Sequence, residues 1–414
     1  MTRRLEKFFA DKERTRRILA LDGGGVRGLL SLGVLAQLED ELRRRSGDRD
    51  YRLSQYFDLI GGTSTGSIIA TALAFGWEVS EVWATYRRLM PEVFGRTIGS
   101  GILKPLFPEK PLARALKKFF ENETLGSTNL ETGLAIFAKR ANSGSAWSFC
   151  NNPRWNFYDV LKPDDEFAPN HTFFLRSLVQ ASAAAPHYFR GVKIKIKADD
   201  PKNRKALQGY FVDGGVCGYN NPALELLTMV RDKAYGFEWP LGADKIYMLS
   251  IGTGFAREPQ EPRGPYVLQT VGALRTMIND VSLQQIAYMQ AMSQVDMPWY
   301  INMEKRDQPS RPYLAAAPNL RFQRVDVRIR SDRDHDDNLL PDTAEALRGQ
   351  PLSERECQEA LKIANISDAN ADILTDLGKR AGDRMLKLAP PPAEFNPLEW
   401  TRRDPFGPGK RRNP

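Results

Sequence analysis

The sequence predicts an α/β fold built on a mostly parallel central sheet. Residues 18–21 (ILAL) are typical of a short buried strand, a glycine-rich loop follows, and leucines then recur at helical spacing. Residues 57–75 repeat this order around a GTSTG turn, and residues 210–230 repeat it around a DGG turn. Strands that alternate with helices favour parallel pairing, because each helix returns the chain to the start of the next strand.

Size and composition indicate a globular protein. The chain has 414 residues and 46.7 kDa, with 42% hydrophobic and 27% charged residues, close to the average of soluble globular proteins. Its mean hydropathy is −0.45, and no apolar run approaches the roughly 20 residues that a spanning helix needs. This excludes an integral membrane protein. Residues 1–17 lack the apolar stretch and cleavage site of a signal peptide, so we expect a cytoplasmic protein.

Cysteine is scarce and widely spaced. Cys150, Cys217 and Cys357 form no CxxC pair and have no histidine at metal-ligand spacing. We therefore expect neither a disulfide framework nor a structural metal site, and a reducing compartment is the simplest location.

Positive charge collects at the two ends of the chain. Residues 1–17 contain seven Lys/Arg against three Asp/Glu, and residues 401–414 contain five against one. Each end therefore has an excess of four positive charges, which together equal the net charge of +8. A nearly neutral body argues against a nucleic-acid polymer as partner. The basic ends, with Leu5, Phe8 and Phe9, are candidates for peripheral contact with anionic lipid; a solvated, frayed terminus is the alternative.

The remaining segments complete the predicted element order. We expect strands at 133–138, 146–150 and 322–329, helices at 174–184 and 267–295, and short helices over 342–387. Residues 94–110 mix glycine, proline and apolar side chains, which indicates a surface loop that could contact lipid. The predicted units are a basic segment 1–16, a main domain 17–330, a helical extension 331–389 packed on it, and a Pro/Gly-rich basic tail 390–414.

The strongest local motif is a serine turn. Gly62-Thr63-Ser64-Thr65-Gly66 matches G-x-S-x-G, with a predicted strand before it and a helix after it. Glycines permit the sharp strand-to-helix turn that exposes a serine hydroxyl at the top of a sheet, and the following helix N-terminus favours developing negative charge. An ordinary Gly/Ser/Thr turn has the same appearance, so the match needs support from other motifs.

The second motif is the glycine-rich loop 22–28, DGGGVRG. Consecutive glycines let backbone N–H groups converge on an anion, which suits either the oxyanion of acyl transfer or a phosphate. Gly23-x-Gly25-x-x-Gly28 also satisfies the dinucleotide fingerprint. That alternative is weakened because the next strand ends in FDLIGG, where an acidic ribose ligand is expected, and runs into the serine turn.

The third motif is Asp213-Gly214-Gly215, which follows an apolar strand and could face the same cleft. A Ser-His-Asp triad is disfavoured: His335 lies in a charged loop (SDRDHDDN), and His187 is more typical of a packing or surface residue. A Ser64–Asp213 dyad is preferred. It requires partial burial of Asp213, because a free aspartate, with a pKa of about 3.9, is a weak base.

Together these residues resemble the patatin-like phospholipase family. DGGGVRG is similar to the family's oxyanion motif, GTSTG to its nucleophile elbow, and DGG (213–215) to its dyad aspartate. ASAAAPHYF (181–189), NNPA (220–223) and KIYMLSIGTG (245–254) are similar to further family blocks. The resemblance covers residues 17–255 closely, and the three core motifs show no departure from the family pattern.

The resemblance implies a three-layer α/β/α fold, with 17–330 as the catalytic domain, and no metal or other cofactor. Ser64 would attack an acyl carbonyl and Asp213 would take its proton, with Gly62 and Gly66 forming the elbow. The oxyanion loop comprises Gly23, Gly24, Gly25, Val26, Arg27 and Gly28, and the backbone N–H groups of Gly24, Gly25 and Val26 would hold the oxyanion. Arg27 would support this loop or the lipid phosphate. The substrates would be acyl esters of phospholipids at a membrane surface.

Regulation and partners stay open at this stage. Some bacterial patatin-like proteins are antiviral effectors that a cyclic nucleotide switches on, which makes a cyclic dinucleotide a candidate activator. The oligomeric state is undetermined. Two other function classes are retained, a non-catalytic lipid-binding module of the same fold and a nucleotide-binding oxidoreductase, which the serine turn disfavours.

Overall fold

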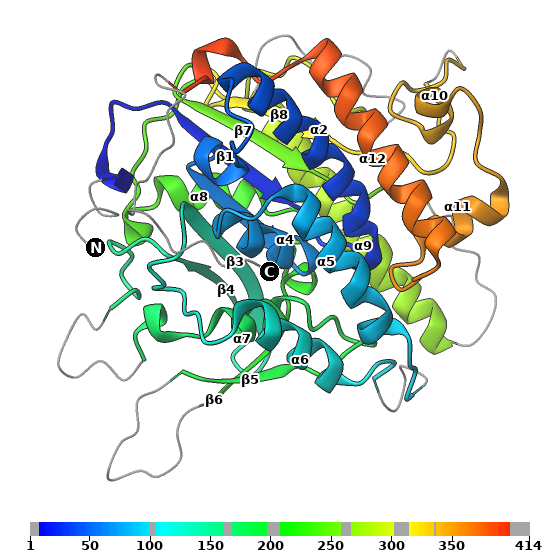
Figure 1. Cartoon of the computed structure of the whole chain (residues 1–414), viewed down its shortest axis with the longest axis horizontal. Helices are drawn as coiled ribbons and strands as arrows, with labels where there is room; N and C mark the ends of the chain where they lie inside the picture. The colour runs from blue at the N-terminus through cyan, green and yellow to red at the C-terminus, as the bar shows by residue number, and fades with distance from the viewer. Residues whose placement is uncertain are drawn as a thin grey trace.

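The computed structural model describes residues 8–99, 105–159, 168–196, 208–257, 266–301, 314–334 and 337–397. Within these ranges the chain forms one eight-stranded sheet with helices packed against it (Figure 1). The strands are β1 (Arg16–Leu21), β2 (Leu59–Thr63), β3 (Gly133–Arg140), β4 (Ser145–Cys150), β5 (Val192–Lys195), β6 (Gln208–Asp213), β7 (Ile246–Ile251) and β8 (Arg321–Val325).

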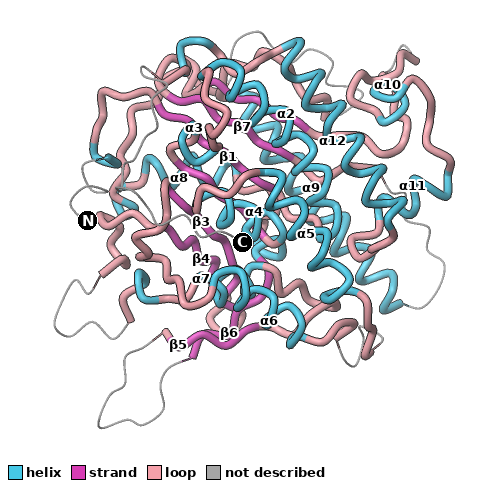
Figure 2. Tube along the Cα trace, in the orientation of Figure 1, coloured by secondary structure: helices cyan, strands magenta, loops and turns pink. Residues whose placement is uncertain are grey.

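The α-helices are α2 (Gly28–Ser46), α3 (Leu53–Tyr56), α4 (Thr65–Ala74), α5 (Val79–Phe94), α6 (Glu109–Phe120), α7 (Leu175–Ser182), α8 (Ala223–Arg231), α9 (Tyr266–Ala291), α10 (Ala344–Arg348), α11 (Glu354–Leu361) and α12 (Asp368–Leu388). Two short 3₁₀ turns matter for the site, η1 (Gly25–Arg27) and η3 (Gly214–Cys217). Figure 2 shows that most strands run through the middle of the molecule, with helices and loops around them, whereas β5 and β6 lie at its lower edge.

The sheet has the order β5-β6-β3-β2-β1-β7-β8, with β4 also paired to β3. The pairings β3–β2, β2–β1, β1–β7 and β7–β8 are parallel, whereas those of β4, β5 and β6 are antiparallel. All residues of β1, β2 and β7 are buried, as expected for parallel strands covered on both faces. The predicted α/β fold with a mostly parallel sheet is confirmed.

Helices cover both faces of the sheet. A Cβ at Gly61 of β2 would meet Leu226 of α8, whereas a Cβ at the next residue, Gly62, would meet Gly66 of α4. Successive residues of a strand point to opposite faces, so α8 and α4 lie on opposite sides. Helices α2, α5 and α12 lie side by side (Figure 1), and α9 contacts α8. The sheet and the helices on its two faces therefore form three layers.

One sequence prediction needs correction in the C-terminal part. The stretch 342–387 was expected to contain only short helices, but α12 has 21 residues and packs along α2. The close approach depends on small residues, because a Cβ at Gly378 would overlap the carbonyl oxygen of Leu30, and one at Gly33 would lie 2.6 Å from the carbonyl oxygen of Thr375. The strands predicted at 133–138 and 146–150 and the long helix at 267–295 are confirmed as β3, β4 and α9.

Several predicted features lie wholly or partly outside the described residues. They are residues 1–7 of the basic N-terminal segment, residues 100–104 of the candidate lipid loop, His335, and the tail from residue 398 onward. Phe9, expected as a lipid contact, is described and fully buried, with its ring packed on Phe237, so that expectation is wrong for this residue. Among the helices that the structure does describe, none combines the length and the apolar character needed to cross a bilayer.

Candidate active site

The sheet brings the serine turn and the DGG turn together on one edge of β3. Thr63, the last residue of β2, is paired with Phe137, and Asp213, the last residue of β6, is paired with Ala138. Because β4 occupies the other edge of β3 over residues 135–140, β2 and β6 must share the remaining edge. Since β2 runs parallel to β3 and β6 antiparallel, the carboxyl ends of β2 and β6 point at each other. Ser64 and Asp213 therefore lie where two strands meet.

Ser64 occupies a strained turn between β2 and α4. Its φ of 53° and ψ of −124° lie outside the regions that side chains other than glycine favour. A Cβ at Gly62 would overlap the backbone of Gly66, and a Cβ at Gly66 would overlap the carbonyl oxygen of Leu21. These positions must be glycine for β2, α4 and β1 to approach so closely, which is the geometry of a nucleophile elbow.

Buried hydroxyl groups hold the Ser64 backbone in this conformation. The Ser64 N–H donates to Oγ of Ser182 over 2.9 Å, and that hydroxyl donates to the Phe137 carbonyl over 2.6 Å. The Ser67 hydroxyl donates to the Ser64 carbonyl over 2.6 Å. Ser182 is fully buried at the end of α7. The sequence showed it only as part of the ASAAAPHYF block, with no indication of its partner.

Asp213 is a buried carboxylate with few partners. The residue is 5% exposed and its carboxylate accepts a 2.7 Å hydrogen bond from the Gly215 N–H, and the Ser64 hydroxyl is near enough to favour its ionised form. Burial raises the pKa of Asp213 to about 6, although the Gly215 N–H and the Ser64 hydroxyl oppose the rise. A carboxylate with this pKa is ionised at neutral pH and is a better proton acceptor than an exposed aspartate.

Two backbone N–H groups of the glycine-rich loop donate no backbone hydrogen bond in the described structure. Within the described ranges, the Gly23 N–H donates to the Asn220 carbonyl, and the Val26 N–H donates to the Ile363 carbonyl. The N–H groups of Arg27 and Gly28 are bonded within the turn. No such bond is made by Gly24 or Gly25 in that part of the chain. Val26, one of the three predicted oxyanion donors, therefore has its N–H committed elsewhere, and Gly24 and Gly25 remain as candidate donors.

Side chains from several elements fix the carbonyl side of this loop. The Gly25 carbonyl accepts hydrogen bonds from the Thr65 and Tyr86 hydroxyl groups, at 3.0 Å and 2.5 Å. The Thr253 hydroxyl donates to the Gly23 carbonyl over 3.1 Å. Arg27 donates to the Gly254 carbonyl over 3.0 Å, so its guanidinium supports the loop. With the carbonyl groups held in this way, the loop has a defined orientation beside Ser64.

Asp22 anchors the start of the loop to a residue far along the chain. Its carboxylate accepts two hydrogen bonds from Arg324 of β8, at 2.9 Å and 2.7 Å, and Arg324 also donates to Asp326 over 2.7 Å. All three side chains are buried. Burial raises the pKa of Asp22 to about 6, against the lowering effect of Arg324. Sequence reasoning did not identify Arg324, because nothing in its local pattern separates it from the other arginines.

Asn220 lies among the three motifs, although sequence reasoning assigned it no role. Its carbonyl accepts the Gly23 N–H, and its side-chain oxygen would lie 2.7 Å from a Cβ at Gly23 and 3.4 Å from one at Gly215. A Cβ at Gly23 would also lie 3.0 Å from the Cβ of Ser64. The structure thus brings the glycine loop, Ser64 and the DGG turn into one place.

The described histidines make other contacts. Nδ1 of His171 is 2.8 Å from the Tyr158 carbonyl, and His187 accepts the Leu106 N–H through its backbone carbonyl. In the residues that the structure describes, no three His, Cys, Asp or Glu side chains gather into a potential metal-binding group. The site as described is a serine, a carboxylate and two backbone donors, which are the groups that acyl transfer needs.

Comparison with known proteins finds one family and several relatives. The family model described as patatin-like phospholipase matches residues 19–227, just over half of the chain. A cGAMP-activated phospholipase of Escherichia coli (strain TW11681) is 29% identical over 258 residues, which cover 59% of this chain and 63% of that protein. A cGAMP-activated phospholipase of Vibrio cholerae serotype O1 is 30% identical over 261 residues, which cover 57% and 64%.

Plant proteins are similar to a comparable extent. Patatin group D-2 of Solanum tuberosum is 27% identical over 262 residues, which cover 60% of this chain and 63% of the plant protein. The alignments thus span less than two thirds of the length of these three relatives. Among solved structures, VipD from Legionella pneumophila matches with a TM-score of 0.35 at 11% identity, covering 90% of this chain and 67% of VipD. A TM-score this low supports no argument about activity.

Proposed function

The chain belongs to the patatin-like phospholipase family, and we propose that it is a serine acyl hydrolase that cleaves fatty-acyl esters of membrane phospholipids. The observation that carries this proposal is the placement of Ser64, on its strained elbow, beside the buried carboxylate of Asp213, where the strands β2 and β6 meet end to end. The glycine loop beside Ser64, with its two uncommitted N–H groups, supports the same reaction.

The proposed reaction proceeds through an acyl-enzyme. Oγ of Ser64 attacks the acyl carbonyl while Asp213 accepts its proton, and the N–H groups of Gly24 and Gly25 stabilise the oxyanion. As the tetrahedral intermediate collapses, the C–O bond to the glycerol breaks and Asp213 returns the proton to the departing alkoxide. Asp213 then deprotonates a water that attacks the acyl-enzyme, which releases the fatty acid and restores the Ser64 hydroxyl.

The test is fatty-acid release from mixed phospholipid vesicles by the wild type, Ser64→Ala and Asp213→Asn. Loss of the nucleophile should lower turnover by at least about 10³-fold, and loss of the base by about 10²- to 10⁴-fold. Ser143→Ala and Asp244→Asn remove the same groups from exposed positions and should retain full activity. Release that survives in Ser64→Ala would mean that another residue is the nucleophile. Vesicle binding without release by the wild type would favour the lipid-binding module.

We further propose that a cyclic dinucleotide activates the enzyme as an antiviral effector at the cytoplasmic face of the membrane. The support is that two relatives, at 29% and 30% identity, are named cGAMP-activated phospholipases. The vesicle assay is therefore repeated with cGAMP and with a panel of other cyclic dinucleotides. Release that appears only with one of them is the expected result. Equal release with and without every nucleotide would contradict this second proposal and leave the first intact.

A further inference from the structure

The carboxyl end of β1 is held by one buried arginine that the reaction scheme above does not use. Arg324 is 3% exposed. It donates two hydrogen bonds to Asp22, one to Asp326 over 2.7 Å and one to the Ser250 hydroxyl over 2.8 Å. It lies in β8, beyond residue 227, where the match to the family model ends.

The partners of Arg324 lead to both sides of the oxyanion loop. Asp22 immediately precedes Gly23, so a bidentate contact to its carboxylate fixes the direction in which the chain enters the loop. Asp326 accepts the Gly254 N–H over 2.8 Å, and the Gly254 carbonyl accepts a hydrogen bond from Arg27 at the other end of the loop. A single guanidinium is thus connected to the beginning and the end of the turn.

Residues 252–254 pack against the glycine-rich loop, and their position depends on Asp326, which Arg324 holds. A Cβ at Gly24 would overlap the Thr253 side chain, and a Cβ at Gly252 would overlap the Asp326 carboxylate. The segment 252–254 therefore packs directly on the loop and on the carboxylate that Arg324 holds. A shift of Asp326 would move Thr253, and with it the Gly24 N–H.

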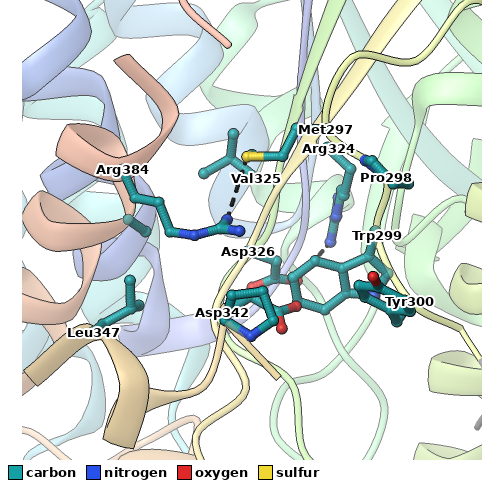
Figure 3. A pocket seen from close by; sticks show the side chains of 12 residues that line it. Met297, Pro298, Trp299, Tyr300, Arg324, Val325, Asp326, Asp342, Leu347 and Arg384 are labelled. Atoms are coloured by element: carbon teal, nitrogen blue, oxygen red, sulfur yellow. Dashed lines mark hydrogen bonds and ion pairs between the residues drawn. The ribbon is translucent and has the colours of Figure 1, made fainter. Parts of the chain in front are cut away.

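On the side away from the glycine-rich loop, Arg324 borders a cavity that is too small for a ligand. A cavity of about 20 Å³ lies there, lined by Trp299, Asp342 and Arg384 among others, and Figure 3 shows Arg384 across it from Arg324. That volume holds about one water molecule, far less than a lipid or a nucleotide. All hydrogen bonds of Arg324 in the described structure go to Asp22, Asp326 and Ser250, on the side of the loop.

We propose that Arg324 is a positioning residue for the oxyanion loop: through Asp22 and Asp326 it holds the N–H groups of Gly24 and Gly25 in place beside Ser64. This inference rests on the proposed function. It predicts that weakening Arg324 slows the chemical step more than it weakens substrate binding, because oxyanion donors act mainly on the transition state.

A buried ion network that only stabilises the fold would behave differently, and the chain contains a matched control. Arg17 is also fully buried and makes bidentate contacts to an aspartate, Asp58. It lies on the same strand as Leu21 but at the opposite end, away from the glycine loop. Arg324→Lys and Arg17→Lys both keep the charge and lose the forked geometry.

The experiment compares the wild type, Arg324→Lys and Arg17→Lys on a soluble p-nitrophenyl ester, with kcat and KM measured separately. Phosphonylation of Ser64 by a fluorophosphonate probe is followed in parallel. We expect Arg324→Lys to lower kcat and the rate of phosphonylation by about 10- to 100-fold, with KM changed much less. We expect Arg17→Lys to lower the melting temperature while kcat and the phosphonylation rate per folded molecule stay within about twofold of the wild type.

The outcomes separate the two proposals. Equal kcat and labelling rates for the two lysine variants, with an active wild type, would overturn the role of Arg324 and leave the acyl hydrolase intact. A wild type that neither turns over the ester nor labels at Ser64 would overturn both. If Arg324→Lys fails to fold, the same measurements are made on Asp326→Asn. This variant keeps an acceptor for the Gly254 N–H but weakens the contact with Arg324. A folded Asp326→Asn with unchanged kcat and labelling would overturn the inference.

Discussion

Strand β1 carries a buried arginine–aspartate network at each end, and the two networks differ in what they hold. At the amino end, Asp58 is completely buried and contacts Arg14, Arg16 and Arg17. At the carboxyl end, Asp22 and Asp326 share Arg324. Arginine is in excess in the first network and aspartate in the second.

The remaining partners explain the difference. At the amino end, guanidinium N–H groups donate to the backbone carbonyls of Phe8 and Phe395, and Arg16 stacks on Trp239. These contacts tie distant ends of the chain to the sheet. At the carboxyl end, the partners lead into the glycine loop and the segment 252–254. Similar side chains therefore stabilise the fold at one end and frame the site at the other, consistent with sites forming at the carboxyl ends of parallel strands.

The largest effect on stability is expected at the amino end of β1. Asp58→Asn removes the charge of a buried carboxylate that forms ion pairs with three arginines. Breaking a buried ion pair from one side costs about 3–5 kcal/mol. We expect a loss of this size in the free energy of unfolding, measured in urea, with turnover per folded molecule unchanged. Asp244→Asn, at the surface, serves as control. A folded Asp58→Asn with impaired turnover would contradict the division of roles.

At the carboxyl end, the largest expected effect is on catalysis. Gly24→Ala places a methyl group onto Thr253 and should displace the loop, lowering kcat/KM by about 100-fold or more, as loss of an oxyanion donor does. Gly349→Ala, a helix cap with no atom near its would-be Cβ, should alter stability alone. Adding Thr253→Gly to Gly24→Ala should restore part of the activity. Wild-type kinetics in Gly24→Ala would show that the loop tolerates displacement.

The activity should depend on pH, because both carboxylates beside the site have a raised pKa. Asp213 and Asp22 each have a pKa of about 6, above the ordinary value because burial disfavours the charged form. Protonation of Asp213 removes the base, so log kcat/KM on a soluble ester should fall by at least one unit per pH unit below about 6. Protonation of Asp22 would weaken its contact with Arg324 and steepen the fall. Activity that stays flat down to pH 5 would contradict this expectation.

The smallest expected effect belongs to a neutral residue of the site. Ser182→Ala removes the acceptor of the Ser64 N–H and should cost about 1 kcal/mol of stability. A few-fold fall in kcat should accompany it, because the strained φ of Ser64 is then less restrained. Thermal unfolding and ester turnover measure the two effects, with the exposed Ser143→Ala as reference. If Ser182→Ala matches that reference in both measurements, the elbow needs no support from α7.

Local features of the site could be predicted from the sequence, whereas its long-range partners could not. The strand–turn–helix units around residues 22–28 and 62–66 depend on neighbouring residues, so their patterns are readable. The antiparallel approach of β6 to β3 gives no such signal, although it places Asp213 beside Ser64. The contact between Arg324 and Asp22 gives no signal either, because the two residues are 302 positions apart in the sequence.

The oxyanion loop shows the same limit at the level of single atoms. Its composition of glycines predicts converging N–H groups, but which of them are uncommitted depends on carbonyls elsewhere. Asn220 and Ile363 supply those carbonyls. The sequence therefore could not separate Val26, whose N–H is committed to Ile363, from Gly24 and Gly25.

The position of β8 has a consequence for the order in which the protein is made. Synthesis proceeds from the amino terminus, so a nascent chain already contains Ser64 and Asp213 long before Arg324 and Ile363 leave the ribosome. Until then Asp22 and Val26 lack the partners they have in the finished protein. If loop positioning limits turnover, a growing or prematurely terminated chain has little of the proposed hydrolase activity, and full activity appears only once β8 has joined the sheet.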